Sequence, residues 1–333
     1  MPESYRIFGV ELSPYSIKVR SYFRYKGIPH IWIPRSQDDM AEFSKFAKLP
    51  LVPLVVSASG EAMQDSTPII EAIEATHHTP GIIPDDPVLA FISALIEEYA
   101  DEWGNKHMFH YRWWYAPDQK SAAERLARGM RPDAADAEVQ AIGEMVRDRM
   151  VNRLSVVGSS PQTRDQIEAS FRRLLGILEA HLSVRPYLFG GRPLFADFGL
   201  AAQLYQAWTD PTPQKLMAAH APAVVTWAER MLHPRNTGDI ESWDRLAPTL
   251  MPLLRDEIAG LFLPWSVANA AALARGEEKF TVILQGKPFA QETQKYHARS
   301  LGILQRRHAA LKNNAALANV LRESGCLEDL ELN

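Results

Sequence analysis

The sequence is nearly free of cysteine: Cys326, close to the C-terminus, is the only one. One cysteine cannot form a disulfide within the chain, and it leaves no Cys-x-x-Cys pair for metal binding or thiol redox chemistry. Such usage is typical of proteins kept in a reducing compartment, and we therefore predict a cytoplasmic location.

An excess of basic charge is also missing. The chain has 36 Lys and Arg residues against 40 Asp and Glu residues, which gives a net charge of −4 at pH 7. A protein with this balance has no positive field that attracts phosphate backbones. We predict small-molecule partners and no nucleic acid.

Long hydrophobic runs are absent as well. No stretch approaches 18 uninterrupted apolar residues, and Met1–Val10 has no basic segment followed by an apolar one. The sequence therefore predicts neither a membrane span nor an export signal. Hydrophobic residues still make up 46% of 333 positions, which is enough for two cores and an extension.

The first 79 residues alternate between strand and helix patterns, with turn residues between them. The expected elements are a strand at 5–12, a helix at 16–26, a strand at 30–34, a helix at 37–48, strands at 51–56 and 62–64, and a helix from 65 to 77. The first two strands should lie parallel, because a helical crossover joins them.

Strand patterns nearly vanish after a proline-containing linker at 79–87. The expected helices lie at 88–115, twice between 117 and 160, at 165–182, at 195–208 and at 224–232. We predict an all-helical domain over 88–235 and a helical C-terminal extension over 236–333 that packs on it.

Four sequence motifs resemble the glutathione transferase family. They are Ser13-Pro14-Tyr15-Ser16 at the first strand-to-helix turn, Leu51-Val52-Pro53-Leu54 before the third strand, Asp65-Ser66 before the third helix, and GGRPLFADF at 190–198. The resemblance covers residues 5 to about 233 and is to the bacterial type, with a longer C-terminal region. It implies a thioredoxin-like α/β domain with a mixed four-stranded sheet, an all-α helical bundle after it, and a homodimer.

The resemblance implies that Ser13 is catalytic. Glutathione reacts as its thiolate, whereas a free thiol, with a pKa near 8.5, is mostly protonated at neutral pH. A hydroxyl group and the N–H groups at the start of a helix stabilise an anion placed there. The alternative is that Ser13 only caps the helix, which is a frequent use of serine.

The resemblance also implies a glutathione-binding set that surrounds this turn. In the family the Val52-Pro53 bond is cis, and it presents the Val52 backbone to the cysteinyl part of the tripeptide. Asp65 and Ser66 would hold the γ-glutamyl end. Lys48 would face the glycine carboxylate, and Tyr15 would be a further contact.

Aromatic residues crowd the end of the first long helix, where related proteins line the electrophile pocket. We predict Trp103, His107, Tyr111 and Trp114 as pocket residues, and core packing is the alternative for each. His107 and a second histidine three positions later suggest metal binding, but no third ligand completes the set, so we predict no metal.

The resulting hypothesis is an enzyme that uses the glutathione thiolate as a nucleophile towards a hydrophobic electrophile. Alternatives are a non-catalytic binding or scaffold protein with the same fold, and a glutathione-dependent lyase or oxidoreductase. Disulfide exchange at the first turn is disfavoured, because Ser13 stands where a glutaredoxin has its nucleophilic cysteine.

Overall fold

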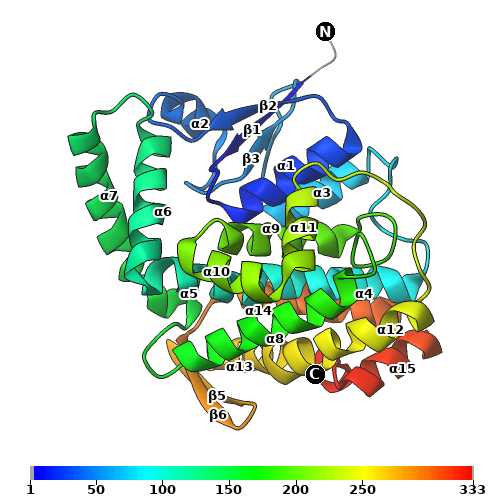
Figure 1. The fold of residues 1–333 in the computed structure, drawn as a ribbon. Helices are drawn as coiled ribbons and strands as arrows, with labels where there is room; N and C mark the ends of the chain where they lie inside the picture. Colours follow the sequence, from blue (N-terminus) through cyan, green and yellow to red (C-terminus); the bar gives the residue numbers. More distant parts are fainter. Residues whose placement is uncertain (1–3, 332–333) are drawn as a thin grey trace.

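The computed structural model describes residues 4–331 (Figure 1). It begins with a four-stranded mixed sheet in the order β2-β1-β3-β4. β1 (Tyr5–Gly9) is parallel to β2 (His30–Pro34) and antiparallel to β3 (Leu54–Val56), which pairs with β4 (Ala62–Gln64). The predicted fold class, a thioredoxin-like α/β domain followed by a helical domain, is confirmed.

Alternate side chains of the strands are buried on opposite faces of this sheet. Ile7 and Val55 belong to the large core shared with α1 (Pro14–Lys26) and α3 (Ser66–Glu74). Phe8 belongs to a smaller cluster on the other face, which α2 (Met40–Phe46) covers. The face with α1 and α3 is therefore the one that meets the helical part of the chain, as Figure 1 shows.

The helical domain begins with one continuous helix made of α4 (Pro87–Tyr99), the π-helical η1 (Ala100–Gly104) and α5 (Asn105–Trp114). The domain continues with α6 (Ala116–Met130), α7 (Asp136–Val151), the short 3₁₀ turn η2 (Leu154–Val157), α8 (Arg164–Leu182), α9 (Phe195–Trp208), α10 (Pro211–His220) and α11 (Pro222–Arg230). The predicted helix at 88–115 corresponds to α4, η1 and α5 together. α9 is almost entirely buried and packs against α1 and α4.

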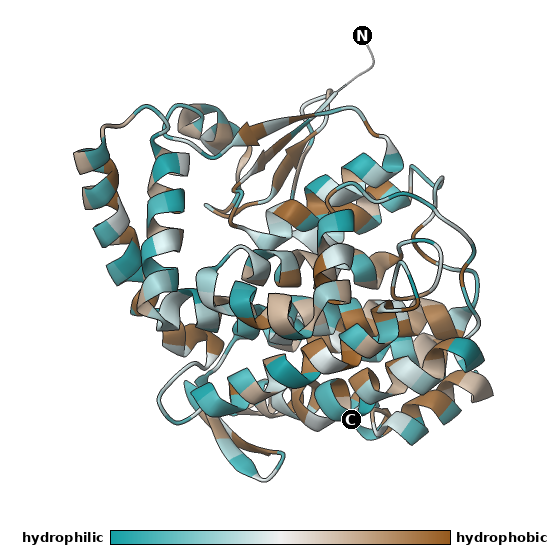
Figure 2. Ribbon diagram, viewed as in Figure 1, coloured by the Kyte–Doolittle hydropathy of each residue, from teal (hydrophilic) through white to brown (hydrophobic). Residues whose placement is uncertain are grey.

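The hairpin of α6 and α7 stands apart from this bundle, at the left of Figure 1. Only three residues of α7 are buried, namely Val139, Gly143 and Val146. A Cβ at Gly143 would lie 3.6 Å from the backbone of Ala123 on α6, an ordinary van der Waals contact, so α6 and α7 lie close together here. Figure 2 shows the contrast, with many hydrophilic positions along this hairpin and more hydrophobic ones between the packed helices.

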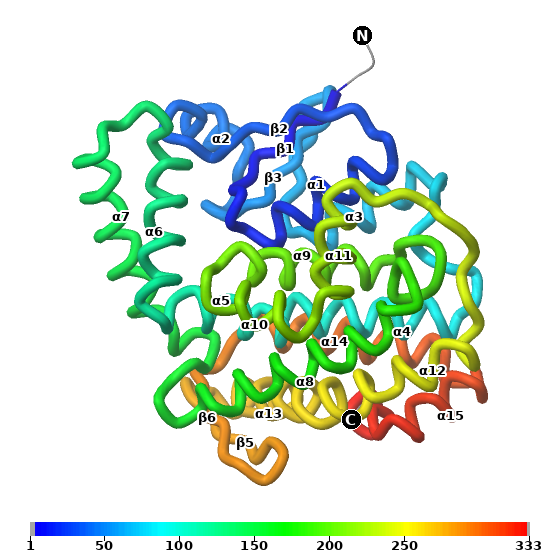
Figure 3. Tube along the Cα trace, in the orientation of Figure 1, coloured from blue at the N-terminus to red at the C-terminus, as the bar shows by residue number. Residues whose placement is uncertain are grey.

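The C-terminal extension starts with a second long helix, made of α12 (Trp243–Pro252), the π-helical η3 (Leu253–Phe262) and α13 (Leu263–Ala274). The extension continues with β5 (Lys279–Leu284), β6 (Lys287–Glu292), α14 (Lys295–Ala310), α15 (Ala315–Ser324) and α16 (Leu327–Leu330). The trace in Figure 3 shows α14 and α15 beside α4, and α15 also contacts η3. The antiparallel hairpin of β5 and β6 differs from the helical extension that the sequence predicted.

By length and composition, the helix at Trp243–Ala274 is apolar enough to cross a membrane. Half of its most apolar window is buried inside the protein, and Leu250, Ile258 and Trp265 are completely enclosed. A core helix satisfies the same test of length and hydropathy. Its apolar side chains belong to the same core cluster as residues of the sheet and of α9.

Candidate active site

Ser13 lies where the sequence placed it, at the N-terminus of α1. Its N–H donates to the Val10 carbonyl oxygen at 2.9 Å, and its Oγ accepts a hydrogen bond from the Ser16 N–H at 3.2 Å. Ser13 is therefore the N-cap, with Pro14 in the first turn. The side chain is half-buried, and its hydroxyl group sits at the positive end of the helix.

The turn before Ser13 is held by the helical domain. Arg112 donates from Nη1 to the Leu12 carbonyl oxygen at 2.8 Å, and Gln206 donates from Nε2 to the Glu11 carbonyl oxygen at 2.7 Å. Arg112 is itself buried and pairs with Asp210 at 2.7 Å. The position of the candidate catalytic group thus depends on contacts about 100 and 195 residues away in the chain.

The Val52-Pro53 peptide bond is cis, as the family resemblance implied. Within residues 4–331, the backbone N–H and C=O of Val52 make no hydrogen bond. Phe8 pairs with Leu54 across the sheet, so Val52 and the Ser13 turn lie at the same sheet end. This backbone is free to pair with an extended peptide.

The loop before this proline is fixed by one side chain of β4. The Gln64 amide oxygen accepts from the N–H groups of Lys48 at 2.8 Å and of Leu49 at 3.0 Å. Its nitrogen donates to the carbonyl oxygens of Leu49 and Leu51. The Lys48 side chain is exposed at this edge. The sequence did not predict this role for Gln64. The sequence feature that could have indicated it is its position immediately before the Asp65-Ser66 motif.

Asp65 and Ser66, which are predicted to hold the γ-glutamyl end, are engaged by other parts of the chain. Asp65 has a left-handed backbone with φ of 79°, and its Oδ2 accepts from the Tyr296 hydroxyl group at 2.7 Å. Ser66 is 2% exposed, and its Oγ accepts from the Lys18 ammonium at 3.3 Å. Tyr296 comes from α14 in the C-terminal extension.

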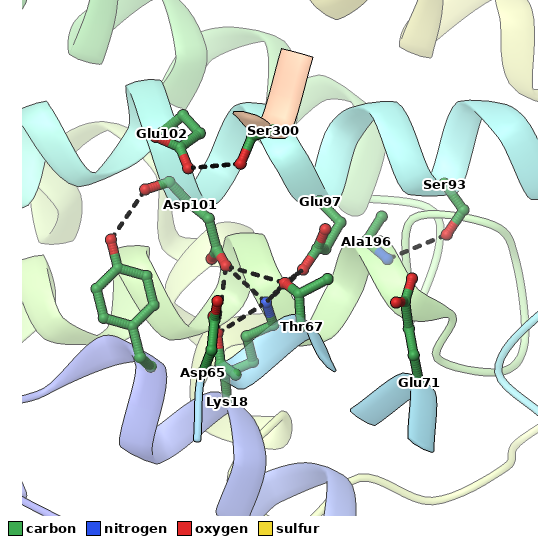
Figure 4. Close-up of polar contacts among 12 residues, drawn as sticks. Lys18, Asp65, Thr67, Glu71, Ser93, Glu97, Asp101, Glu102, Ala196 and Ser300 are labelled. Carbon is green, nitrogen blue, oxygen red and sulfur yellow. Dashed lines mark hydrogen bonds and ion pairs between the residues drawn. The ribbon is translucent and has the colours of Figure 1, made fainter. Parts of the chain in front are cut away.

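Lys18 is the centre of a buried polar network between α1, α3 and α4 (Figure 4). Its ammonium donates to Thr67 Oγ1 at 2.9 Å and to Asp101 Oδ2 at 2.6 Å, and it also pairs with Glu97. Burial lowers the pKa of Lys18, but the charges of Asp101 and Glu97 outweigh it and raise the pKa overall. The sequence reading missed this lysine. The sequence feature that could have indicated it is the pair of acids at i and i+4, Glu97 and Asp101, on the facing helix.

Tyr15 belongs to the same network. Its hydroxyl group donates to the Asp101 carbonyl oxygen at 2.9 Å, and burial raises the pKa of Tyr15 well above its usual value. The phenol therefore stays protonated and is committed to the backbone of η1. This contact links α1 to the π-helical turn that carries Asp101.

Three of the predicted electrophile-pocket residues are enclosed in the core, which corrects their placement at an open pocket. Trp103, His107 and Tyr111 are 1%, 1% and 2% exposed. Trp103 Nε1 donates to Ser170 Oγ at 3.0 Å, and His107 Nε2 lies 2.8 Å from the same oxygen. Burial lowers the pKa of His107 to about 3, so this ring is neutral. Trp114 is half-buried.

The comparisons with known proteins concern both domains. The model of the glutathione S-transferase N-terminal domain matches residues 7–81, and the model of the C-terminal domain matches residues 161–230. The two matched segments therefore belong to the N- and C-terminal domains of the glutathione S-transferase family. Residues 82–160 and 231–333 lie outside both matches, so α6, α7 and the C-terminal extension are not covered by the family models.

Among solved structures, a glutathione S-transferase from Methylobacterium radiotolerans, in complex with glutathione sulfonate, is 18% identical with a TM-score of 0.42. The match covers 72% of this chain and 98% of that one. The β-etherase LigF from Sphingobium sp. is 16% identical with a TM-score of 0.49, covering 68% and 94%. FzlA from C. crescentus is 20% identical with a TM-score of 0.45, covering 69% and 90%. A search of the curated proteins finds no match.

No group of three or more His, Cys, Asp or Glu side chains is placed to hold a metal ion within residues 4–331. The acids around Lys18 are instead paired with its ammonium and with hydroxyl groups.

Proposed function

We propose that this protein binds glutathione at the Ser13 turn and uses its thiolate as a nucleophile towards a hydrophobic electrophile. The observation that carries the proposal is the pairing of two features at one sheet end. Ser13 Oγ caps α1, and the cis Val52-Pro53 segment has an unpaired backbone beside it. The first would stabilise the sulfur anion, and the second would hold the cysteinyl part.

In this proposal Ser13 donates its hydroxyl hydrogen bond to the thiolate. The Ser16 N–H group, which now binds Ser13 Oγ, belongs to the positive end of the helix. Together they lower the pKa of the glutathione thiol, so that more of it is ionised at neutral pH. Lys48 is exposed at the same edge and is available to the glycine carboxylate.

The test is turnover of an activated aryl chloride such as 1-chloro-2,4-dinitrobenzene with glutathione. Ser13→Ala should reduce kcat by about 10²-fold or more while glutathione still protects the protein against thermal unfolding. Ser59→Ala, at an exposed serine of the hairpin between β3 and β4, is the matched control and should keep full turnover. Equal turnover of Ser13→Ala and the parent would refute the catalytic role.

A second candidate is a binding or scaffold protein that kept the fold without the chemistry. It is favoured by one observation: the groups expected to hold the γ-glutamyl end are occupied, Asp65 by Tyr296 and Ser66 by Lys18. Tyr296→Phe removes the competing hydroxyl group and leaves Asp65 able to accept from a ligand ammonium. Tighter glutathione binding by this variant favours the enzyme, and no binding by either protein favours the scaffold.

We also propose that the protein is a cytoplasmic homodimer. The cytoplasmic assignment is supported by the lone Cys326, which is buried at 0% exposure. The dimer is supported only by the matches to the two domains of the family. Light scattering after size-exclusion chromatography tests it, since a mass near the 37.4 kDa of a single chain would refute it.

A further inference from the structure

A serine, a histidine and a glutamate meet in the helical domain where α5 and α8 pack together. Ser159 Oγ lies 2.7 Å from His110 Nδ1, and His110 Nε2 lies 3.4 Å from Glu168 Oε1. The three residues come from different elements. His110 is on α5, Glu168 is on α8, and Ser159 is in the loop between η2 and α8.

The hydrogen-bond network fixes the roles of the two histidine nitrogens. An ionised carboxylate can only accept, so Nε2 carries the proton and donates to Glu168. Nδ1 is then the acceptor for the Ser159 hydroxyl group. Glu168 is held in place by Tyr115, whose hydroxyl group donates at 2.6 Å, and by Arg172 at 2.8 Å. Burial raises the pKa of Glu168, but these partners and His110 lower it overall, which keeps it ionised.

Ser159 also lines an open cavity of about 700 Å³. The cavity lies between this loop, α13 and the hairpin of β5 and β6, the hairpin seen at the lower edge of Figure 1. Apolar residues and hydrogen-bond donors share its wall. They include Ala268, Ala271, Phe280, Gln162 and Lys279. This volume suits a small organic molecule.

The backbone beside Ser159 is built for a close approach. Gly158 has a left-handed φ of 76°, and a Cβ at this position would lie 2.7 Å from Gln291 Oε1 and 2.8 Å from the Phe289 ring. Only glycine fits between the loop and β6. The loop is further fixed by Thr163, whose hydroxyl group donates to the Gly158 carbonyl oxygen at 2.5 Å. The serine is thus held between a base and a cavity on a rigid turn.

We propose that Ser159, His110 and Glu168 form a second active site, which hydrolyses small uncharged carboxylic esters bound in this cavity. Ser159 and His110 are the catalytic residues, and Glu168 is the positioning residue. The histidine and its partners satisfy the geometry of an activated nucleophile, with serine, base and orienting acid in hydrogen-bond contact. Neither family model covers Ser159 or His110.

In the first half-reaction, Ser159 Oγ bonds to the ester carbonyl carbon, the carbonyl π pair moves to oxygen, and the hydroxyl proton moves to His110 Nδ1. The carbonyl re-forms as the carbon–alkoxy bond breaks, and the leaving alcohol takes that proton. Water then attacks the acyl-serine, again giving a proton to His110, and the released Ser159 oxygen recovers it. The products are one carboxylic acid and one alcohol. Gln162 and Lys279 supply hydrogen-bond donors in the cavity wall for the developing oxyanion.

Covalent labelling of the full-length protein tests the nucleophile directly. An alkyl fluorophosphonate should add to the parent chain once, with loss of fluoride, and peptide mass spectrometry should place the adduct on Ser159. Ser155→Ala is the matched control, since Ser155 lines the same cavity but is exposed. It should be labelled like the parent, whereas Ser159→Ala should not be labelled. A parent chain without an adduct at Ser159 overturns the proposal, whatever the folding of the variants.

Hydrolysis of p-nitrophenyl acetate tests the complete site. Ser159→Ala should reduce the rate to that of the buffer, and His110→Gln should reduce kcat by about 10²-fold or more. Glu168→Gln should lower kcat with KM unchanged, a split that a general loss of structure would not produce. The assay is run without glutathione, which separates this proposal from the glutathione reaction. Ester hydrolysis that is equal in the parent and Ser159→Ala would overturn it.

Discussion

Replacement of Lys18 by methionine is the sharpest test of the buried network beneath the candidate glutathione site. The substitution keeps a long side chain but removes the ammonium, whose side chain is 0% exposed. Glu97 and Asp101, at 2% and 11% side-chain exposure, would then share one site without a cation. Thr67 would lose a hydrogen-bond donor as well.

The size of the effect follows from what remains buried. Removing one partner of a buried pair costs about 3–5 kcal/mol, because an uncompensated charge is left in a low-dielectric site. Two acids depend on Lys18, so we expect Lys18→Met to lose about 5 kcal/mol of the free energy of unfolding at pH 8. The double variant with Glu97→Gln should recover part of that loss, since one of the two stranded charges is then neutral.

Urea unfolding followed by circular dichroism measures this free energy. Lys45→Met is the matched control, because Lys45 is an exposed lysine of α2 without a salt bridge among the described residues, and it should change the free energy of unfolding by less than about 0.5 kcal/mol. A loss below about 1 kcal/mol for Lys18→Met would contradict the reasoning, because it would mean that the acids do not need this ammonium.

Two further predictions concern pH and packing. His181 is buried with its pKa lowered to about 4 by burial, so the unfolded chain binds its proton at higher pH than the folded chain. Stability should therefore fall by up to about 3 kcal/mol as pH falls from about 6.5 to 4. His181→Gln should remove this residue's share of the pH dependence of the urea midpoint, leaving the share of other buried histidines such as His107, and the exposed His220→Gln should not change it. Gly191→Ala would bring a Cβ within 2.4 Å of the Gly238 backbone and should cost about 1–3 kcal/mol in a melting experiment. Gly129→Ala, with nothing within 4 Å, should not destabilise the protein.

The N-terminal domain was predictable because each of its elements has a local signal. Short β-prone runs mark the strands, and the third helix begins at Ser66, within the predicted Asp65-Ser66 start. The first helix begins at Pro14, two residues before the predicted start at position 16. The order of all seven elements is confirmed, with ends that differ by a few residues. The long helix through α4, η1 and α5 was equally accessible from its unbroken apolar pattern.

The hydrogen bonds that Asp65 and Ser66 make with other parts of the chain were not predictable from local sequence signals. Tyr296 and Asp65 are 231 positions apart, and nothing near either residue indicates their hydrogen bond. In the sequence, Lys18 looks like an ordinary lysine on the surface of a helix, and only the packing of α4 against α1 buries it. Contacts of this kind depend on tertiary packing, which sequence periodicity does not report.

The predictions for the aromatic residues of η1 and α5, and for the extension that contains the hairpin, differ from the structure for different reasons. A stripe such as Trp103 and Tyr111 looks the same in a pocket wall and in a core, and here α8 covers it. The hairpin did have a signal, since Gln285-Gly286 joins two runs with alternating buried positions. Both turn residues have positive φ, as two-residue hairpin turns require.

Calorimetric titration of the full-length protein with glutathione tests the central claim most directly. The account predicts saturable binding at millimolar or lower ligand concentration, with one tripeptide bound per chain. Heat equal to that of dilution across the whole millimolar range would contradict it. The cis-proline edge beside Ser13 would then have to be assigned a role other than glutathione binding.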